Sequence, residues 1–295
     1  MDQLQPPSRP ARLMLVGAGR VGTAVTYLLQ HAGYPVVGVA SRSEVSARAA
    51  AVRLSAPVLS FADDGWPETD IVLLGVPDDA IAEVGRSVTA RTRGPLVVVH
   101  LAGSLGTSPL RELTAVGHGV AALHPVQACP DVDTAIRRIP GSAWGVTCTT
   151  GLEEWAQAMV VDDLRGAPVA VPEEARPLWH AASVMTSNGI AALIAFGEEL
   201  LMAAGIPSDA VVLGPLAAGT VQNAREGGGG AATLTGPIVR GDVGTIERHL
   251  DALGAASPML KEHYRLVARV ILAAARSEGR VNDDRAAGIT AMLER

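Results

Sequence analysis

Residues 13–22, LMLVGAGRVG, constrain the fold of this chain more than any other stretch. An apolar segment leads into Gly17, Gly19 and Gly22, which have the spacing G-x-G-x-x-G, and a helix is expected over residues 20–31. Such glycines permit a tight turn, the approach of a pyrophosphate to bare backbone, and close packing of helix on strand. The free N–H groups of the helix would bind the phosphates. The predicted dinucleotide contacts are Gly17, Ala18, Gly19, Arg20, Val21 and Gly22; the alternative is a glycine-rich turn without a ligand.

The end of the next strand indicates which dinucleotide is bound. Residues 35–40, PVVGVA, are apolar throughout and predict a buried parallel strand. An NAD-binding fold places Asp or Glu at the end of this strand to bind the ribose hydroxyls. Here Ser41, Arg42 and Ser43 follow instead. A guanidinium flanked by hydroxyl groups suits a 2′-phosphate, which favours NADP(H). Ser43 can at the same time cap the next helix.

Apolar runs continue to alternate with helical segments up to residue 171. Further strands are expected at residues 70–76, 95–100, 120–123, 144–148 and 168–171. This alternation predicts a doubly wound α/β domain over residues 12–171. Val76, Pro77 and Ser104 lie at the carboxyl ends of such strands, where ligands of parallel sheets bind, and are further predicted cofactor contacts. Ser104 has the alternative role of a helix cap.

Residues 172–295 have no strand pattern and predict an all-helical second domain. Helices are expected over about 172–204, 208–226, 242–253 and 257–276, with Ser208, Asp242 and Ser257 as capping residues. Residues 1–11 contain three prolines and no hydrophobic stretch, so we expect a disordered tail and no signal peptide.

The first of these helices carries the candidate catalytic residues. Residues 189–196 are apolar on all sides, which predicts a buried helix. His180 and Asn188 lie eight residues apart and therefore on one side of the helix. Either neighbouring helices satisfy these polar groups, or the groups line a wet cleft that faces the nicotinamide.

Charge and cysteine content exclude several partners. The net charge is -6 and no basic cluster occurs, which argues against nucleic acid. Cys129 and Cys148 suit a reducing compartment, and no metal-ligand spacing is present. Uninterrupted apolar runs are shorter than the ~20 residues of a membrane helix. We therefore expect a cytoplasmic protein without a metal or a membrane partner.

Six stretches carry a resemblance to a known family: GAGRVG, GVPDDAI, HLAGS, LHPVQ, SNGIAAL and LTGPIVRGD. The chain resembles a bacterial family in which a Rossmann-like domain precedes a helical domain of unknown function, and which is similar to 6-phosphogluconate dehydrogenase-like reductases. Some members resemble an alternative ketopantoate reductase. Better known ketopantoate reductases place a lysine four and eight residues before two asparagines. His180 stands at the lysine position, Val184 replaces the first asparagine, and Asn188 matches the second. The resemblance also implies a homodimer formed through the helical domain.

These observations predict an NADPH-dependent reductase of a small 2-oxo acid, and the family resemblance implies ketopantoate (2-dehydropantoate) as the leading substrate. His180 would donate the proton, Asn188 would orient the carbonyl, and Arg240 would bind the carboxylate. His124 is a rival proton donor because it ends a strand; otherwise it is a turn residue ordered by Pro125. An ion pair with Asp242 is the alternative for Arg240.

The sequence is also compatible with two other functions. Without the lysine of the better known reductases, the chain could be a non-catalytic NADP-binding sensor or scaffold. The His124-Pro125 pair also resembles a prephenate-type dehydrogenase.

Overall fold

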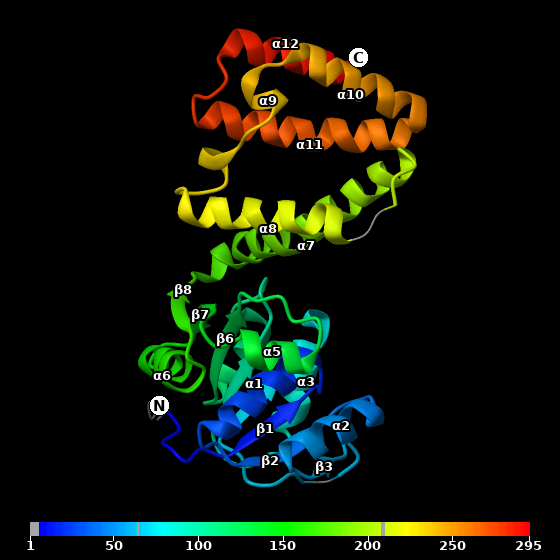
Figure 1. Ribbon diagram of the computed structural model, residues 1–295. Coiled ribbons are helices and arrows are strands. Elements are labelled where there is room, and N and C mark those ends of the chain that lie inside the picture. Colours follow the sequence, from blue (N-terminus) through cyan, green and yellow to red (C-terminus); the bar gives the residue numbers. More distant parts are fainter. Residues whose placement is uncertain (1–5, 64, 208–209) are drawn as a thin grey trace. The chain divides into compact units, whose positions relative to one another are not determined.

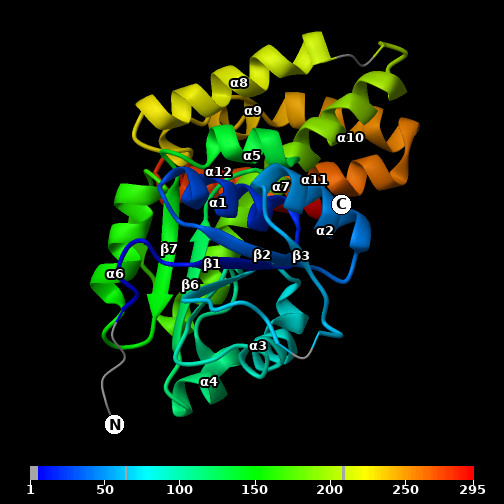
Figure 2. The same ribbon diagram turned by 90° about the horizontal axis from the view of Figure 1, so that it is seen from below.

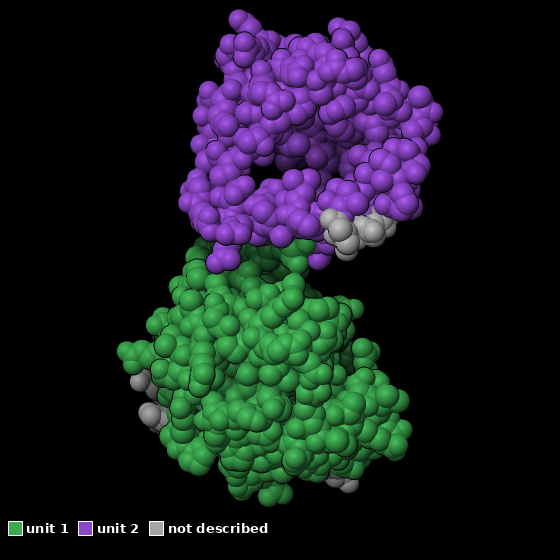
Figure 3. Space-filling model, in the orientation of Figure 1, with its two compact units in different colours: residues 1–187 green, residues 188–295 purple. Residues whose placement is uncertain are grey.

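The computed structural model describes residues 6–63, 65–207 and 210–295 (Figure 1). The chain divides into two compact units, residues 1–187 and 188–295 (Figure 3). The expected domain boundary after residue 171 therefore differs from the division in the structure. The reason is that helix α7 (Arg176–Ala203) begins in the first unit, where its first side chain, Arg176, is fully buried.

An eight-stranded sheet forms the first unit, in the order β3-β2-β1-β4-β5-β6-β7-β8. All neighbouring strands are parallel except β6 and β7, which are antiparallel. The strands expected from the sequence are present, but the two-residue β3 and the reversal at β7 were not predicted. The strands are β1 (Leu13–Val16), β2 (Val36–Ala40), β3 (Val58–Leu59), β4 (Ile71–Leu74), β5 (Val97–His100), β6 (Gly119–Pro125), β7 (Ala143–Cys148) and β8 (Ala167–Ala170).

Helices cover both faces of this sheet, which explains the continuous apolar runs of its strands. Figure 2 shows α1 (Arg20–His31), α2 (Glu44–Leu54) and α5 (Val132–Arg138) on one face, and α3 (Ile81–Thr89) and α4 (Arg111–Ala115) on the other. Every residue of β1, β4 and β5 is buried as a result. A short helix, α6 (Glu153–Ala158), precedes β8. The predicted α/β class with a doubly wound domain is confirmed.

The N-terminal segment is more ordered than expected. Ala11 is 1% exposed and belongs to the main core. The Arg9 guanidinium forms an ion pair with Asp163, whose side chain is 1% exposed, and lies 5.6 Å from the ring centre of Tyr34. The prediction of a disordered tail through residue 11 is therefore wrong for residues 9–11. A buried carboxylate needs a charged partner, and this segment provides it.

The second unit is helical, as expected, with a core built by its last four helices. Ile246, Leu250, Leu272 and Ile289 are among the buried residues of this core. Asp242 caps α10 as predicted, through the backbone N–H of Thr245. The cap predicted at Ser208 lies outside the described residues. Helices α9 and α12 were not predicted. The helices that follow α7 are α8 (Ala210–Glu226), α9 (Pro237–Arg240), α10 (Val243–Ala256), α11 (Pro258–Ser277) and α12 (Asp283–Glu294).

Helix α7 differs most from its expected environment. Its only buried residue is Arg176, whereas Leu178, Met185 and Leu193 are 77%, 66% and 49% exposed. The predicted burial of residues 189–196 is therefore wrong for the single chain. Together with the turn before it, residues Glu173–Ala203 form one helical segment that is long and apolar enough, by length and composition, to cross a membrane. The expectation drawn from uninterrupted apolar runs missed this segment because polar but uncharged residues divide it.

Candidate functional site

The glycine turn after β1 is built around a very close approach of two backbone segments. Gly17 has a φ of +92°, and a Cβ there would lie 2.6 Å from the Gly75 backbone and from a Val76 methyl group. A Cβ on Gly22 would lie 3.0 Å from the Gly17 carbonyl oxygen. Gly19 is the N-cap residue of α1, and no side chain caps the helix there. Free N–H groups at the start of α1 therefore remain available to an anion.

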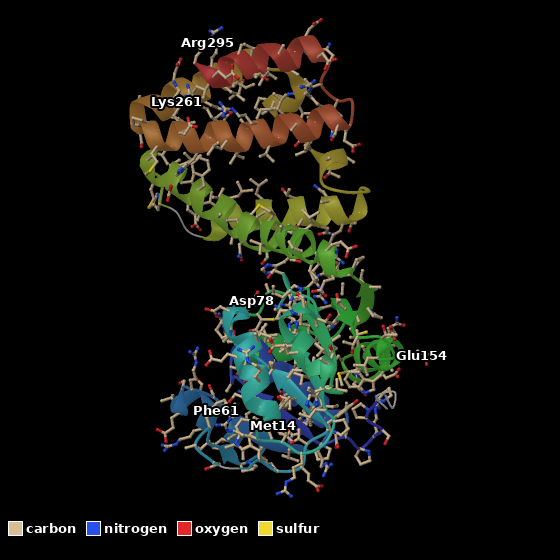
Figure 4. The ribbon with its side chains drawn as sticks, turned by 180° about the vertical axis from the view of Figure 1, so that it is seen from behind. Met14, Phe61, Asp78, Glu154, Lys261 and Arg295 are labelled. Carbon is tan, nitrogen blue, oxygen red and sulfur yellow. The ribbon has the colours of Figure 1, made fainter. Side chains whose placement is uncertain are left out.

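A cavity of about 230 Å³ opens at this turn. It brings together seven of the predicted cofactor contacts: Gly17, Ala18, Gly19, Ser41, Arg42, Val76 and Pro77. Six further residues, which the sequence did not single out, complete the lining: Val16, Ser46, Phe61, Gly75, Ala80 and Val84. Figure 4 shows where Phe61 lies in this unit. Backbone N–H groups and a guanidinium are groups that bind phosphates, and here the glycine turn and Arg42 line one cavity.

The other predicted cofactor contacts lie outside this lining. The Arg20 guanidinium donates to the Pro130 carbonyl (3.0 Å), and Val21 packs against the main core. Ser43 accepts the Ser46 N–H (3.3 Å), so its alternative role as N-cap of α2 is confirmed. The Ser104 hydroxyl donates to a carboxylate oxygen of Asp78 (2.8 Å).

Two histidines meet at the carboxyl end of the parallel strands. His124 lies at the end of β6 and His180 in the second turn of α7, with ring centres 5.6 Å apart and planes at 88°. Gly103, in the loop after β5, lies against both rings. A Cβ there would come within 2.5 Å of His180 Cδ2 and 2.8 Å of His124 Nε2. Residues from a strand end, a helix and a loop therefore converge on one point.

His124 is neutral at physiological pH. Burial lowers its pKa to about 4, and the neighbouring His180 and Arg176 act in the same direction, against Asp78. Its Nδ1 accepts a hydrogen bond from the indole N–H of Trp179 (3.1 Å). Figure 4 labels Asp78 at the edge of this unit, in the turn that follows β4. His124 therefore offers a hydrogen bond, not an imidazolium proton, at neutral pH.

Arg176 holds the strand ends beneath these histidines. Its Nε donates to Thr147 Oγ1 (2.7 Å), and one terminal nitrogen donates to the carbonyls of Ala122 (2.5 Å) and Gly145 (3.1 Å). Burial lowers its pKa to about 10. The ion pairs among the described residues do not include Arg176. No sequence pattern indicates this role, because an arginine at a helix start usually lies in solvent.

Asn188 and Arg240 belong to the second unit and are exposed. Arg240 ends α9, and Asp242 uses its carboxylate to cap α10 through Thr245. Within the described parts of the chain, the recorded ion pairs do not join Arg240 to Asp242. The predicted roles of Asn188 and Arg240 toward a substrate stay predictions.

Family models match both parts of the chain. Residues 3–125 match a Rossmann-like domain, and residues 142–271 match a domain of unknown function, DUF2520. The fold and these matches define a two-domain protein of the Rossmann-like class. A Rossmann-like match followed by a DUF2520 match is the arrangement that the family resemblance implied, and this resemblance is therefore confirmed.

Solved structures share this two-domain fold over almost their full length. A candidate NADP oxidoreductase from Bacteroides fragilis is 24% identical, with 89% of this chain and 98% of that chain covered and a TM-score of 0.73. An imine reductase from Myxococcus stipitatus in complex with NADP+ is 18% identical (90% and 93% covered, TM-score 0.59). A pyrroline-5-carboxylate reductase from Coxiella burnetii is 16% identical (93% and 100% covered, TM-score 0.57). No curated protein sequence matches the chain significantly. At these identities, the similarity shows a common fold.

The buried histidines predict a loss of stability in mild acid. Burial lowers the pKa of both His100 and His124 to about 4, from about 6.5 when unfolded. The unfolded chain therefore binds more protons than the folded chain between these values. The free energy of unfolding should fall as the pH is lowered from 6.5 to 4, by up to about 1.4 kcal/mol per pH unit for each histidine.

Urea unfolding at half-unit pH steps measures this loss. His124→Asn should make the profile less steep, with the contribution of His100 remaining, whereas His249→Asn, at an exposed position, should leave it unchanged. A wild-type profile that is already flat between pH 6.5 and 4 would contradict the buried, neutral state of both rings.

Proposed function

We propose that the protein is an NADP(H)-dependent oxidoreductase that reduces a C=O or C=N bond of a small molecule. The observation that carries this proposal is the single cavity that combines the bare backbone of Gly17 and Gly19 with Arg42 and Ser41. A pyrophosphate would bind the N–H groups at the start of α1. Arg42 would bind the 2′-phosphate by paired hydrogen bonds, with Ser41 and Ser46 beside it.

The two histidines provide the remaining chemistry. When bound, the nicotinamide supplies a hydride to the substrate carbon. The substrate oxygen or nitrogen then needs a hydrogen-bond donor and a proton. Because His124 is neutral, we assign it the hydrogen bond and assign the proton transfer to His180. This choice between the two rings refines the expectation from the sequence, where His124 was the rival proton donor.

The substrate class has two candidates. A 2-oxo acid, with ketopantoate as the leading example, follows from the family resemblance, and would use Asn188 to orient the carbonyl and Arg240 to bind the carboxylate. A cyclic or acyclic imine is the second candidate, because proteins of the same fold include an imine reductase and a pyrroline-5-carboxylate reductase. Both substrates need the same hydride and proton, so His124 and His180 would serve either substrate.

A substrate panel tests the proposal and separates the alternatives. Loss of NADPH absorbance would be followed with 2-oxo acids, including ketopantoate, with cyclic imines, and with oxo acids plus amines. Turnover of one class supports a reductase of that class. Tight NADPH binding without turnover on any compound would favour the sensor or scaffold. Reduction of NADP+ by prephenate with release of carbon dioxide would favour the prephenate-type dehydrogenase.

Arg42 should determine the preference for NADPH over NADH. Arg42→Ala should weaken NADPH binding roughly 10- to 100-fold, as expected for lost hydrogen bonds to a charged group, and leave NADH binding nearly unchanged. Fluorescence titration with each cofactor measures both affinities. Arg48→Ala is the matched control, since Arg48 lies on α2 and pairs with Glu44 on the exposed surface. Equal weakening for both cofactors would show that Arg42 does not contact a 2′-phosphate.

His180 should act as the proton donor. His180→Asn should lower kcat about 100-fold or more, which is the usual contribution of a general acid, with little change in the NADPH dissociation constant. Steady-state kinetics on the substrate found in the panel measures kcat. His249→Asn, on α10, serves as the control and should retain wild-type kcat. A loss of only a few-fold for His180→Asn would exclude this role.

We also propose that two copies of the chain associate through α7 and α8. No described residue of α8, and none of α7 after Arg176, is buried in the single chain. Residues 177–197 carry no Asp, Glu, Lys or Arg, and Figure 3 shows an opening through the second unit. An exposed apolar surface of this extent is typical of an interaction site. The same helices of a second copy are equally apolar and could pack against it. The exposed apolar residues include Leu178, Met185, Leu193, Met202, Leu216 and Val221.

Light scattering during size-exclusion chromatography tests this assembly. The wild-type protein should elute with the mass of a dimer, and Leu193→Glu or Leu216→Glu should shift it toward monomer, because each buries a charge in the interface. Val52→Glu, at an exposed position of α2, is the control. A monomeric wild-type protein that sediments with lipid vesicles would instead assign the apolar helix to a membrane.

A further inference from the structure

The hydrogen bond between Trp179 and His124 determines which ring nitrogen of His124 carries the proton. An indole N–H can only donate, so Nδ1 of His124 must be an unprotonated acceptor. A neutral imidazole carries one proton, which then lies on Nε2. This nitrogen is the one that lies next to Gly103, where a Cβ would be 2.8 Å away, and on the side of His180. The proton of His124 is thereby directed toward the point where the two rings meet.

The place of Trp179 is built into the sheet. Gly145 of β7 pairs with His124 of β6, and a Cβ on Gly145 would lie 2.7 Å from the indole nitrogen of Trp179. Only a residue without a side chain leaves room for the indole at this position. The Gly145 carbonyl also accepts from the buried Arg176 guanidinium, three residues before Trp179 on α7. One helix turn is therefore held at the β6–β7 ladder by two separate contacts.

The charged groups around His124 favour its neutral form. His180 and Arg176 face it from α7, and Asp78 faces it from the turn after β4. Asp78 is engaged by the Ser104 hydroxyl (2.8 Å), and Glu173 accepts the N–H groups of Thr107 and Ser108. The Asp78 carboxylate therefore already accepts a hydrogen bond from Ser104. Among the described residues, no hydrogen bond joins Asp78 to His124.

We propose that Trp179 is a positioning residue that holds His124 in the Nε2–H tautomer, so that His124 presents a neutral hydrogen-bond donor to the reacting oxygen or nitrogen of the substrate. The role of His124 toward a substrate rests on the proposed reductase function. The tautomer itself does not depend on any substrate and can be measured in the protein alone. The two rings then have different roles. His124 donates a hydrogen bond and keeps its proton, whereas His180 transfers its proton to the substrate. No oxidation state changes at either ring.

Long-range ¹H–¹⁵N correlation spectra of the full-length protein, labelled at histidine, test the tautomer without substrate. His124→Asn identifies the His124 signals. In the wild-type protein, we expect the Nε2–H pattern from pH 5.5 to 8.5. Trp179→Phe keeps an aromatic ring but removes the donor, and should give a mixture of both tautomers. Trp155→Phe, on α6 of the same unit, is the matched control and should leave the His124 pattern unchanged.

Two results would overturn the proposal: an Nδ1–H pattern in the wild-type protein, or an unchanged Nε2–H pattern in Trp179→Phe. If Trp179→Phe fails to fold, Gly145→Ala provides a second variant, since its new methyl group displaces the indole and should produce the same mixture. These spectra remain informative even when no substrate is turned over, so failure of the reductase proposal is recognised separately.

Steady-state kinetics then tests whether the Nε2–H tautomer of His124 contributes to the reaction. With the substrate found in the panel, Trp179→Phe should lower kcat roughly tenfold and leave KM for NADPH unchanged, because the lost interaction is one oriented hydrogen bond made to the reacting atom. Unchanged kcat together with a mixed tautomer would show that the orientation of His124 does not serve the reaction.

Discussion

The close approach of Gly17 to Gly75 is the constraint on which the first unit depends. The end of β1 and the end of β4 come so near that a Cβ at Gly75 would lie 2.4 Å from the Gly17 carbonyl oxygen. The same contact brings Gly22 of α1 against this turn, whose Gly17, Ala18 and Gly19 line the cavity. Close packing of the central strands and the shape of this cavity therefore depend on bare backbone at the same place.

A second set of contacts organises the edge where the histidines meet. Arg176 is a fully buried cation that is satisfied by a hydroxyl and by backbone carbonyls of β6 and β7. Such carbonyls stabilise the charge without neutralising it, and the charge of Arg176 adds to the effect of burial, which lowers the pKa of His124. His100, also buried, uses its Nε2 to bond the Gly106 carbonyl (2.7 Å) and so shapes the loop that contains Gly103. The arrangement keeps His124 neutral and fixes the backbone around it before any ligand binds.

In the second unit, the apolar composition of a helix predicts that another surface covers it, but it does not show which molecule provides that surface. Its buried core is made by α9 to α12, whereas α7 and α8 leave their apolar side chains exposed. A helix that is apolar on all sides requires a covering surface, but the covering atoms can belong to the same chain, to a second copy, or to lipid. The expectation of burial within one chain followed from periodicity alone, and for this reason it was wrong.

By itself, the sequence predicted the glycine turn after β1, most of the strands and helices, and Arg42 at the end of β2 as a candidate cofactor contact. These features are local: periodicity, capping residues and glycine spacing act within a few residues of one another. Only the tertiary structure decided that β7 runs antiparallel to β6, that Arg176 is buried, and that Trp179 donates to His124 although 55 residues separate them in the chain. Such contacts depend on which surfaces pack together, and no short stretch of sequence carries that information.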